Sequence, residues 1–292
     1  MKISCFGEVL WDIFPNHKKI GGAPLNVALR LKTMGIDSSI ITKVGFDALG
    51  NDIITYIDKK GLSIETIQKD KEHHTGEVLV SLDTEGIASY EISRPVAWDF
   101  IEIEDSALKE ISKSDAIIFG SLAARNEVSR NTLFDLLNNA KFKVLDVNLR
   151  PPHYDAQLLS ELMKRADFIK LNDEELDEVH IHFGIKETTL EKQIKGLAIA
   201  TNTSQICITK GGKGATLYYN DCFYHNNGYK IKVVDTVGAG DSFLATLISK
   251  LLLGVEPQSS IDYACAIGAM VAGSEGANPV FSDTEILSFI EK

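Results

Sequence analysis

Short, nearly continuous apolar runs recur along this chain, and stretches with a helical repeat lie between them. Strands buried on both faces and separated by helices form a parallel sheet that helices cover on either side. The pattern therefore predicts an α/β fold with one mostly parallel central sheet, closed by two helices. The clearest runs are residues 116–120, 144–148, 168–171 and 206–209, and the closing helices are residues 242–253 and about 259–272.

Residues 73–99 have a different pattern. Val78 and Val80 alternate with polar neighbours, residues 83–86 have the composition of a turn, and alternation resumes at residue 87. A period of two indicates strands with one face turned away from the core. We therefore expect a β-hairpin inserted in the α/β chain, and because unpaired strand edges seek partners, a homodimer through this hairpin.

Composition excludes several classes of partner. The net charge of −11 argues against nucleic acid and anionic membranes. The four cysteines contain no C-x-x-C pair, and we interpret them as free, buried thiols in a reducing compartment. The N-terminal apolar run is broken at Glu8 and Asp12, and no stretch approaches the roughly 18 uncharged apolar residues that span a bilayer. We expect a cytoplasmic protein, with residues 1–292 in a single domain.

The segment from Asp235 to Phe243 reads Asp-Thr-Val-Gly-Ala-Gly-Asp-Ser-Phe, directly before a helical pattern. Small residues let the backbone approach a ligand, and the free N–H groups of a helix start bind anions. Asp241 has two interpretations: it caps a helix that begins there, or it accepts the proton of an attacking hydroxyl. The two glycines that precede Asp241 within three residues favour the second.

Two common nucleotide motifs are absent. Gly212-Lys213 is followed by Gly214, so no P-loop sequence occurs. Gly238-x-Gly240 is followed by Phe243 in the position of the third glycine of a dinucleotide-binding fingerprint. An NAD-dependent oxidoreductase is accordingly a remote alternative.

Three further segments place glycine or polar residues at predicted strand ends or helix starts. Residues 21–26 combine paired glycines with Asn26, whose amide can both donate to and accept from vicinal hydroxyls. Residues 209–214 form a glycine-rich turn that suits a nucleotide, and residues 170–175 end in carboxylates that could orient hydrated Mg²⁺. Each also has a structural interpretation, as a plain turn, a tight hairpin and an acidic first helical turn respectively.

In this order, the four segments resemble the ribokinase-like (PfkB-type) carbohydrate kinases, over essentially the whole chain. The resemblance implies a three-layer α/β/α sandwich with an eight- or nine-stranded, mostly parallel sheet. It also implies a small β-sheet lid over the sugar, to which residues of about 11–20 and 73–99 correspond. The implied activity is transfer of a phosphoryl group from ATP, with Mg²⁺, to a sugar hydroxyl.

Carried over position by position, the resemblance makes Asp241 the general base that deprotonates the sugar hydroxyl. It assigns the anion hole for the phosphoryl group to the amides of Gly238, Ala239 and Gly240. The other implied contacts are to the sugar from Asp12, Gly22, Asn26, Trp98 and Arg150, to the nucleotide from Asn172, Thr209, Gly211, Gly212, Gly214, Gly276 and Ala277, to Mg²⁺ through water from Glu175, and to K⁺, as in many members, from Asp235 and Val237.

Within the family, residues 6–12, 96–99 and 146–150 resemble bacterial fructokinases, which convert D-fructose to D-fructose 6-phosphate. Kinases of 2-keto-3-deoxygluconate share the Asp-x-Asn-x-Arg pattern, and in such an enzyme Arg150 would meet the substrate carboxylate. A nucleoside kinase on the same fold is another alternative. A non-catalytic sugar or nucleotide sensor is a further one, against which the presence of Asp241 argues.

Overall fold

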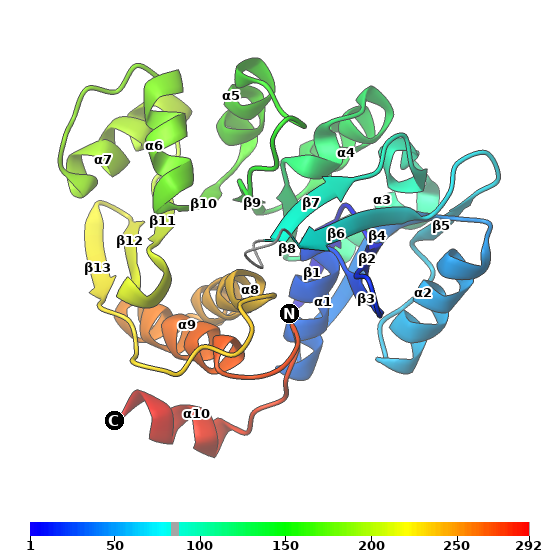
Figure 1. Cartoon of the computed structure of the whole chain (residues 1–292). Helices are drawn as coiled ribbons and strands as arrows, with labels where there is room; N and C mark the ends of the chain where they lie inside the picture. The colour runs from blue at the N-terminus through cyan, green and yellow to red at the C-terminus, as the bar shows by residue number, and fades with distance from the viewer. Residues whose placement is uncertain (83–87, 292) are drawn as a thin grey trace.

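A nine-stranded sheet runs through the centre of the computed structural model, which describes residues 1–82 and 88–291 (Figure 1). Its strands are β1 (Lys2–Phe6), β4 (Asp37–Gly45), β5 (Ile67–Asp70), β8 (Ala116–Gly120), β9 (Lys143–Asp146), β10 (Phe168–Asn172), β11 (Gln205–Thr209), β12 (Ala215–Tyr219) and β13 (Cys222–Asn226). The order is β13-β12-β11-β10-β9-β8-β1-β4-β5, and every pairing is parallel except those of β12. The parallel sheet predicted from the apolar runs is confirmed.

Helices cover both faces of this sheet (Figure 1). On one face lie α1 (Ala23–Thr33), α2 (Ala48–Lys59), α8 (Ala239–Leu252) and α9 (Pro257–Ala272), and on the other α3 (Asp105–Lys113), α4 (Glu127–Asn139), α5 (Ala156–Arg165), α6 (Asp173–His182) and α7 (Leu190–Thr201). The result is the expected three-layer α/β/α sandwich. None of the helices in the described ranges is long and apolar enough to cross a membrane.

After α8 and α9, the two closing helices that the sequence predicted, the chain forms a further helix that the sequence pattern did not predict. This helix is α10 (Asp283–Ile290), which packs on α9. None of its side chains is fully buried, and its apolar stripe is short, consisting of the partly buried Ile286, Phe289 and Ile290. A local signal was nevertheless present, because Ser282 and Glu285 form a capping box at its start.

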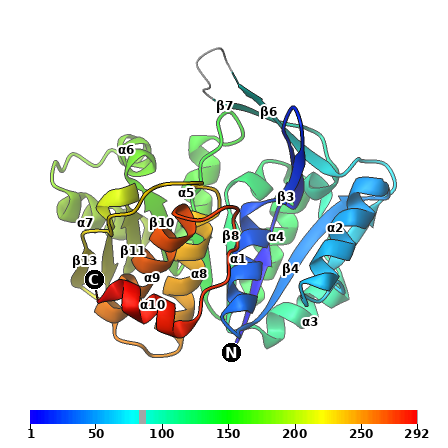
Figure 2. The same ribbon diagram turned by 60° about the horizontal axis from the view of Figure 1, so that its bottom comes forward.

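The predicted hairpin belongs to a second, four-stranded sheet. Its strands are β2 (Leu10–Ile13), β3 (Lys18–Gly21), β6 (Gly76–Leu82) and β7 (Ala88–Ile92), in the order β3-β2-β6-β7. The antiparallel pairing of β6 with β7 confirms the hairpin, whereas the turn predicted at residues 83–86 lies outside the described residues. Figure 2 shows this sheet projecting from the large sheet.

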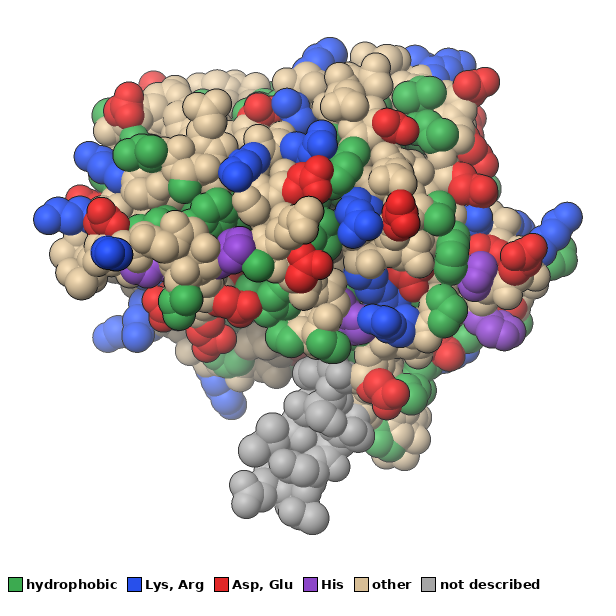
Figure 3. Space-filling view, turned by 90° about the horizontal axis from the view of Figure 1, so that it is seen from above, with side chains coloured by type: hydrophobic (Ala, Val, Ile, Leu, Met, Phe, Trp, Pro, Cys, Tyr) green, Lys and Arg blue, Asp and Glu red, His purple; other side chains and the backbone are tan. Residues whose placement is uncertain are grey.

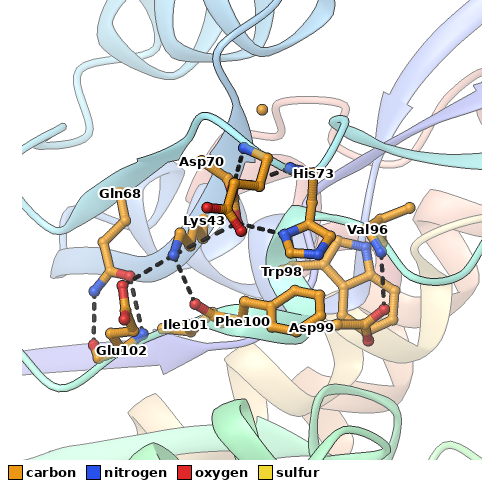
Figure 4. Close-up of polar contacts among 12 residues, drawn as sticks. Lys43, Gln68, Asp70, His73, Val96, Trp98, Asp99, Phe100, Ile101 and Glu102 are labelled. Atoms are coloured by element: carbon orange, nitrogen blue, oxygen red, sulfur yellow. Dashed lines mark hydrogen bonds and ion pairs between the residues drawn. The ribbon is translucent and has the colours of Figure 1, made fainter.

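A polar cluster fixes both ends of the hairpin to the large sheet (Figure 4). Lys43 donates from Nζ to Phe100 O at 2.9 Å and forms an ion pair with Asp70 at 3.5 Å. Asp70 also accepts from the backbone N–H of His73, whose ring stacks on Phe100 with 3.7 Å between centroids. The short helix η1 (Ala97–Phe100) that follows the hairpin is thereby bound to the chain that precedes it.

Charges of both signs are mixed on one face of the molecule (Figure 3). Figure 3 shows the side of the molecule on which α4–α7 lie, and there acidic and basic side chains are interspersed. A nucleic-acid partner requires a clustered basic surface. The side shown in Figure 3 presents mixed charges rather than such a cluster, and the absence of a nucleic-acid partner stays a prediction.

All four cysteines are free thiols, as predicted. Cys5, Cys207 and Cys265 are buried, but Cys222 is exposed, so the prediction of burial is wrong for that residue. Cys222 opens β13, an edge strand of the large sheet, which pairs only with β12 among the described strands.

Candidate active site

The first turn of α8 brings the predicted base close to Asp146 and Lys170, toward the carboxyl ends of β9 and β10. The helix begins at Ala239 with Gly238 as its N-cap, so the predicted start near Asp241 is two residues too late. Gly238 has a φ of +77°, and a Cβ there would lie 2.5 Å from the Cβ of Ala277. Asp241 therefore lies within the first turn rather than at the cap, and its carboxylate accepts from Asn26 Nδ2 at 2.8 Å.

The three amides predicted as an anion hole differ in availability. Ala239 N–H donates to Thr236 O at 3.2 Å. The N–H groups of Gly238 and Gly240 have no backbone partner among the described residues. The ammonium of Lys170 lies 3.6 Å from the point where a Cβ on Gly240 would stand. Two amides and a neighbouring cation thus make this helix start a site for an anion.

The environment of Asp241 suits a general base. Burial raises the pKa of Asp241 to about 6, and Asp146 adds to the rise. The hydrogen bond from Asn26 and the charges of Lys170 and Arg150 act in the opposite direction. The carboxylate is therefore mainly ionised at pH 7 yet accepts a proton more readily than an exposed aspartate would.

A buried ion pair lies behind the base, and the sequence analysis did not single it out. Lys170 Nζ contacts Asp146 at 2.9 Å and 3.2 Å, and both side chains are under 9% exposed. Burial opposes the charge of Lys170, but Asp146 and Glu175 more than offset it and raise its pKa. The two residues are register neighbours on β9 and β10. A charged residue within each of two apolar runs was the available signal.

On the expected sugar side, Asn26, Gly22 and Asp12 lie at the junction of the two sheets. Gly22 has a φ of +114°, and a side chain there would strike the carbonyl of Glu8. Asp12 is half-buried against Gly21, and burial raises its pKa while Lys19 opposes the rise.

Glu8 is a pocket residue that the sequence analysis did not identify as such. It is 4% exposed, and its Oε2 has no hydrogen-bond partner among the described residues. Burial raises the pKa of Glu8 to about 7, while the charges of Arg150 and Arg125 favour the ionised form. Its position directly after the strand β1, where ligands of parallel sheets bind, was the signal that could have marked it.

The expected sugar contact from Trp98 is not supported by its position. Trp98 has no exposed surface, and the guanidinium of Arg125 covers its ring at 3.9 Å. Arg125 binds both carboxylate oxygens of Asp99, at 2.7 and 2.8 Å, and the carbonyl of Ser93. Trp98 is therefore the floor beneath Arg125. The sugar contact of Trp98 was predicted only from its neighbours in the sequence. A local sequence pattern does not reveal which side chains cover an aromatic ring in the folded protein.

Arg150 is exposed, and its Nη1 donates to Leu149 O at 2.8 Å. Its charge acts on both Asp241 and Glu8, which places the guanidinium beside the pocket. Arg150 forms no ion pair among residues 1–82 and 88–291, so its charge is available to an anionic ligand.

Asn172 and Glu175 form a capping box at the start of α6. Asn172 Oδ1 accepts from Glu175 N at 2.7 Å, and Glu175 Oε2 accepts from Asn172 N at 2.8 Å. Glu175 Oε1 accepts from Leu149 N at 2.9 Å, so this buried carboxylate joins the ends of β9 and β10. A water-mediated contact to Mg²⁺ would use the remaining lone pairs of these oxygens.

The predicted nucleotide loop is also a tight hairpin. Thr209 ends β11, residues 211–213 form a short 3-10 turn, and β12 returns antiparallel. A Cβ on Gly211 or Gly212 would meet nothing within 4 Å. The backbone of these two glycines therefore forms a ledge that is open to a ligand. Gly214, with a φ of +80°, packs against the backbone of Asn226 and Gly228. The structural and the ligand-binding interpretations are thus compatible.

The residues expected to bind K⁺ lie together. Asp235 Oδ1 accepts from Val237 N–H at 3.0 Å, and Ala277, next to Gly276, packs against Gly238. Lys19 Nζ lies 3.9 Å from Asp235 Oδ2 and would compete with a bound cation. No group of three or more His, Cys, Asp or Glu side chains is arranged for a metal within the described ranges. K⁺ binding stays a prediction.

Comparisons with known proteins agree with this fold. The model of the pfkB family of carbohydrate kinases matches residues 3–284. A fructokinase from Vibrio alginolyticus is 28% identical, over 97% of this chain and 97% of its own length. Among solved structures, a 2-dehydro-3-deoxygluconokinase from Thermotoga maritima superimposes with a TM-score of 0.87 at 22% identity, covering 100% of this chain and 98% of its own. A fructokinase double mutant from Vibrio cholerae O395, solved with fructose, ADP and potassium, superimposes with a TM-score of 0.83 at 22% identity, covering 99% and 98%.

Proposed function

The chain belongs to the pfkB family of carbohydrate kinases, and from this premise we propose that it transfers the γ-phosphoryl group of ATP to D-fructose, giving D-fructose 6-phosphate. The observation that carries the chemistry is the half-buried carboxylate of Asp241, held by Asn26 beside the amides of Gly238 and Gly240. Fructose is the preferred acceptor because the similar curated relatives include fructokinases.

In the proposed reaction, Asp241 accepts the proton of the sugar hydroxyl as its oxygen attacks the γ-phosphorus. The bond between that phosphorus and the β–γ bridging oxygen breaks, and ADP leaves with the electron pair. The amides of Gly238 and Gly240, with Lys170 beneath them, stabilise the charge on the transferring group. Bound Mg²⁺ would neutralise the phosphates, and Glu175 is the residue that would orient its waters.

Substrate placement follows from the two sheets. We place ATP over the open ledge at Gly211 and Gly212 and the sugar between Asp12 and Asn26. We further propose that residues 1–292 act as a single domain in which residues of about 11–20 and 73–99 close as a lid. Closure would exclude water, which otherwise competes as the phosphoryl acceptor.

An ADP-release assay on the purified protein tests this function. Fructose, 2-keto-3-deoxygluconate, ribose, tagatose and nucleosides are compared at equal concentration. Asp241→Asn is expected to lower kcat/KM by roughly 10²–10⁴-fold with an unchanged fold. Asp283→Asn is the matched control, because Asp283 also lies in the first turn of a helix but is exposed. Near-normal turnover by Asp241→Asn would refute the assignment of the base.

A second candidate substrate is 2-keto-3-deoxygluconate. The specific observation in its favour is Arg150, an exposed cation beside the pocket that makes no ion pair in the described ranges. A substrate carboxylate would fill that role. A kcat/KM for 2-keto-3-deoxygluconate above that for fructose, lost in Arg150→Met, would establish this alternative.

A homodimer through the small sheet, K⁺ activation and a cytoplasmic location remain predictions. The outer strands of the small sheet, β3 and β7, each pair with one strand only among the described residues. Light scattering at assay concentration tests the dimer, which a monomeric mass would exclude. Exchanging KCl for NaCl in the ADP-release assay tests the cation.

A further inference from the structure

Two side chains of α1 each join α8 to the C-terminal segment formed by residues 277–279. Asn26 and Arg30 are one turn apart and therefore lie on the same face of the helix. Asn26 contacts Asp241 and Asn278, and Arg30 contacts Ser242 and Pro279. Asp241 and Asn278 thus contact one turn of α1, and the residues that follow them, Ser242 and Pro279, contact the next turn.

The first of these connections determines the orientation of an amide. Asn26 Nδ2 donates to Asp241 Oδ2 at 2.8 Å, and Asn278 Nδ2 donates to Asn26 Oδ1 at 3.3 Å. An ionised carboxylate only accepts hydrogen bonds, so Asn26 must turn its nitrogen toward Asp241. Asn278 supplies the donor that keeps the oxygen of Asn26 on the opposite side.

The second connection is a buried arginine. Arg30 is 2% exposed, donates from Nε to Ser242 Oγ at 3.0 Å and donates from Nη1 to Pro279 O at 2.8 Å. Burial lowers the pKa of Arg30 to about 10, so the guanidinium stays charged at neutral pH. It forms no ion pair within the part of the chain that the structure describes. A buried cation without a carboxylate costs free energy, which its two hydrogen bonds and the ring of Phe281, 5.7 Å from the guanidinium, offset in part, since Nη2 has no hydrogen-bond partner among the described residues.

The C-terminal segment also touches the anion hole. Ala277 packs against Gly238 so closely that any side chain at position 238 would collide with it. In this segment Ala277 contacts Gly238, the N-cap of α8. Asn278 contacts Asn26, which binds Asp241, and Pro279 contacts Arg30, which binds Ser242.

We propose that Asn278 and Arg30 are positioning residues for phosphoryl transfer, which orient Asn26 and the first turn of α8 so that the carboxylate of Asp241 faces the sugar hydroxyl. The inference rests on the proposed kinase function. Neither residue touches the reacting atoms, and both act through groups that do.

Other charged groups also act on Asp241 and must be constant in any test. They are Asp146 on β9, Lys170 on β10, Glu8 after β1 and Arg150 after β9, and the neutral thiol of Cys5 on β1 lies near them. An uncharged substitution at position 278 leaves all of these in place and adds no charge, so a change in the titration of Asp241 in such a variant reports the hydrogen-bond chain itself.

Asn278→Asp is the decisive variant. An ionised aspartate cannot donate, so it would take the Nδ2 of Asn26 and turn the oxygen of that amide toward Asp241. We expect kcat/KM at pH 7 to fall about tenfold and the acidic limb of its pH profile to rise by about one unit, because a lost donor destabilises the ionised base. KM for ATP is expected to change less than about twofold.

Three further variants keep the proposal falsifiable. Val280→Asp adds the same charge two residues further along, on a side chain that is 75% exposed, and should leave the profile of the wild type unchanged. Asn278→Leu keeps the size and removes the donor, and should lower kcat by a similar factor. Arg30→Lys keeps the charge but cannot reach both Ser242 and Pro279, and should lower kcat more than it raises KM for ATP.

The carboxyl pKa of Asp241, followed by ¹³C NMR titration, is a readout that does not depend on turnover. A rise in Asn278→Asp and in Asn278→Leu, but not in Val280→Asp, is expected, and because leucine adds no charge of its own, equal pKa values in the wild type and Asn278→Leu would overturn the inference. If Asp241→Asn is inactive while Asn278→Asp and Asn278→Leu behave as the wild type, the positioning role alone fails. If Asp241→Asn stays active, the proposed base fails, and the NMR titration still decides whether Asn278 orients this carboxylate.

Discussion

The Asp146–Lys170 pair lies beneath the anion hole, and Lys170→Met removes its cation while nearly preserving its volume. The two side chains are 7% and 8% exposed, and their charged atoms are 2.9 Å apart. Without Lys170, the carboxylate of Asp146 would be buried without a counterion. Breaking a buried pair on one side typically costs about 3–5 kcal/mol of unfolding free energy.

The same variant should change the pH dependence of activity. Lys170 lowers the pKa of Asp241 whereas Asp146 raises it. Removing the lysine removes one of the groups that lower the pKa of Asp241, so the acidic limb of kcat/KM is expected above its wild-type position near pH 6. A purely structural loss would lower activity without moving that limb.

Urea unfolding followed by circular dichroism measures the free energy, and the melting temperature should fall by about 6–10 °C. Lys141→Met is the matched control: its ion pair with Asp115 spans 3.4 Å, its side chains are 57% and 43% exposed, and its loss should cost under about 1 kcal/mol. The double variant Asp146→Asn/Lys170→Met should recover most of the stability. A cost equal to that of Lys141→Met, or no recovery in the double variant, would refute the reasoning.

Three further predictions concern titration and backbone geometry. Wild-type kcat/KM should fall below about pH 6 as Asp241 becomes protonated, and a profile that is flat to pH 4.5 would contradict its role as base. Burial raises the pKa of Glu8 from 4.5 to about 7, so the stability that its proton provides is lost as the pH rises through 7. Glutamine does not titrate, so the unfolding free energy of Glu8→Gln relative to that of the wild type should increase by up to about 3 kcal/mol between pH 4 and pH 9. Unfolding free energies of the two proteins that change equally with pH would exclude this. Gly214→Ala should lower unfolding free energy by about 2 kcal/mol because of its positive φ and close backbone neighbours, whereas Gly212→Ala, which faces open space, should cost under about 0.5 kcal/mol; equal costs in thermal melts would disprove the strain argument.

Features that depend on a local pattern could be predicted from the sequence. A residue's tendency to be buried and the repeat of apolar positions act over a few residues, so the runs at 116–120 and 206–209 indicated strands of a covered parallel sheet. The alternation around Val78 indicated a hairpin for the same reason. The glycines before Asp241 indicated a helix start able to bind an anion, although the cap lies at Gly238.

The partners of the polar side chains were decided only by tertiary structure. Asn26 meets Asp241 across 215 positions, Arg30 meets Pro279 across 249, and Lys170 meets Asp146 because β9 and β10 are neighbours in register. No local repeat encodes such contacts, since they depend on which strands pair and which helices share a face. The sequence by itself thus determined the layered fold and a Gly-rich helix start with a carboxylate. The packing of distant segments decided how that carboxylate is held, because hydrogen bonds and burial depend on position in space rather than on order in the chain.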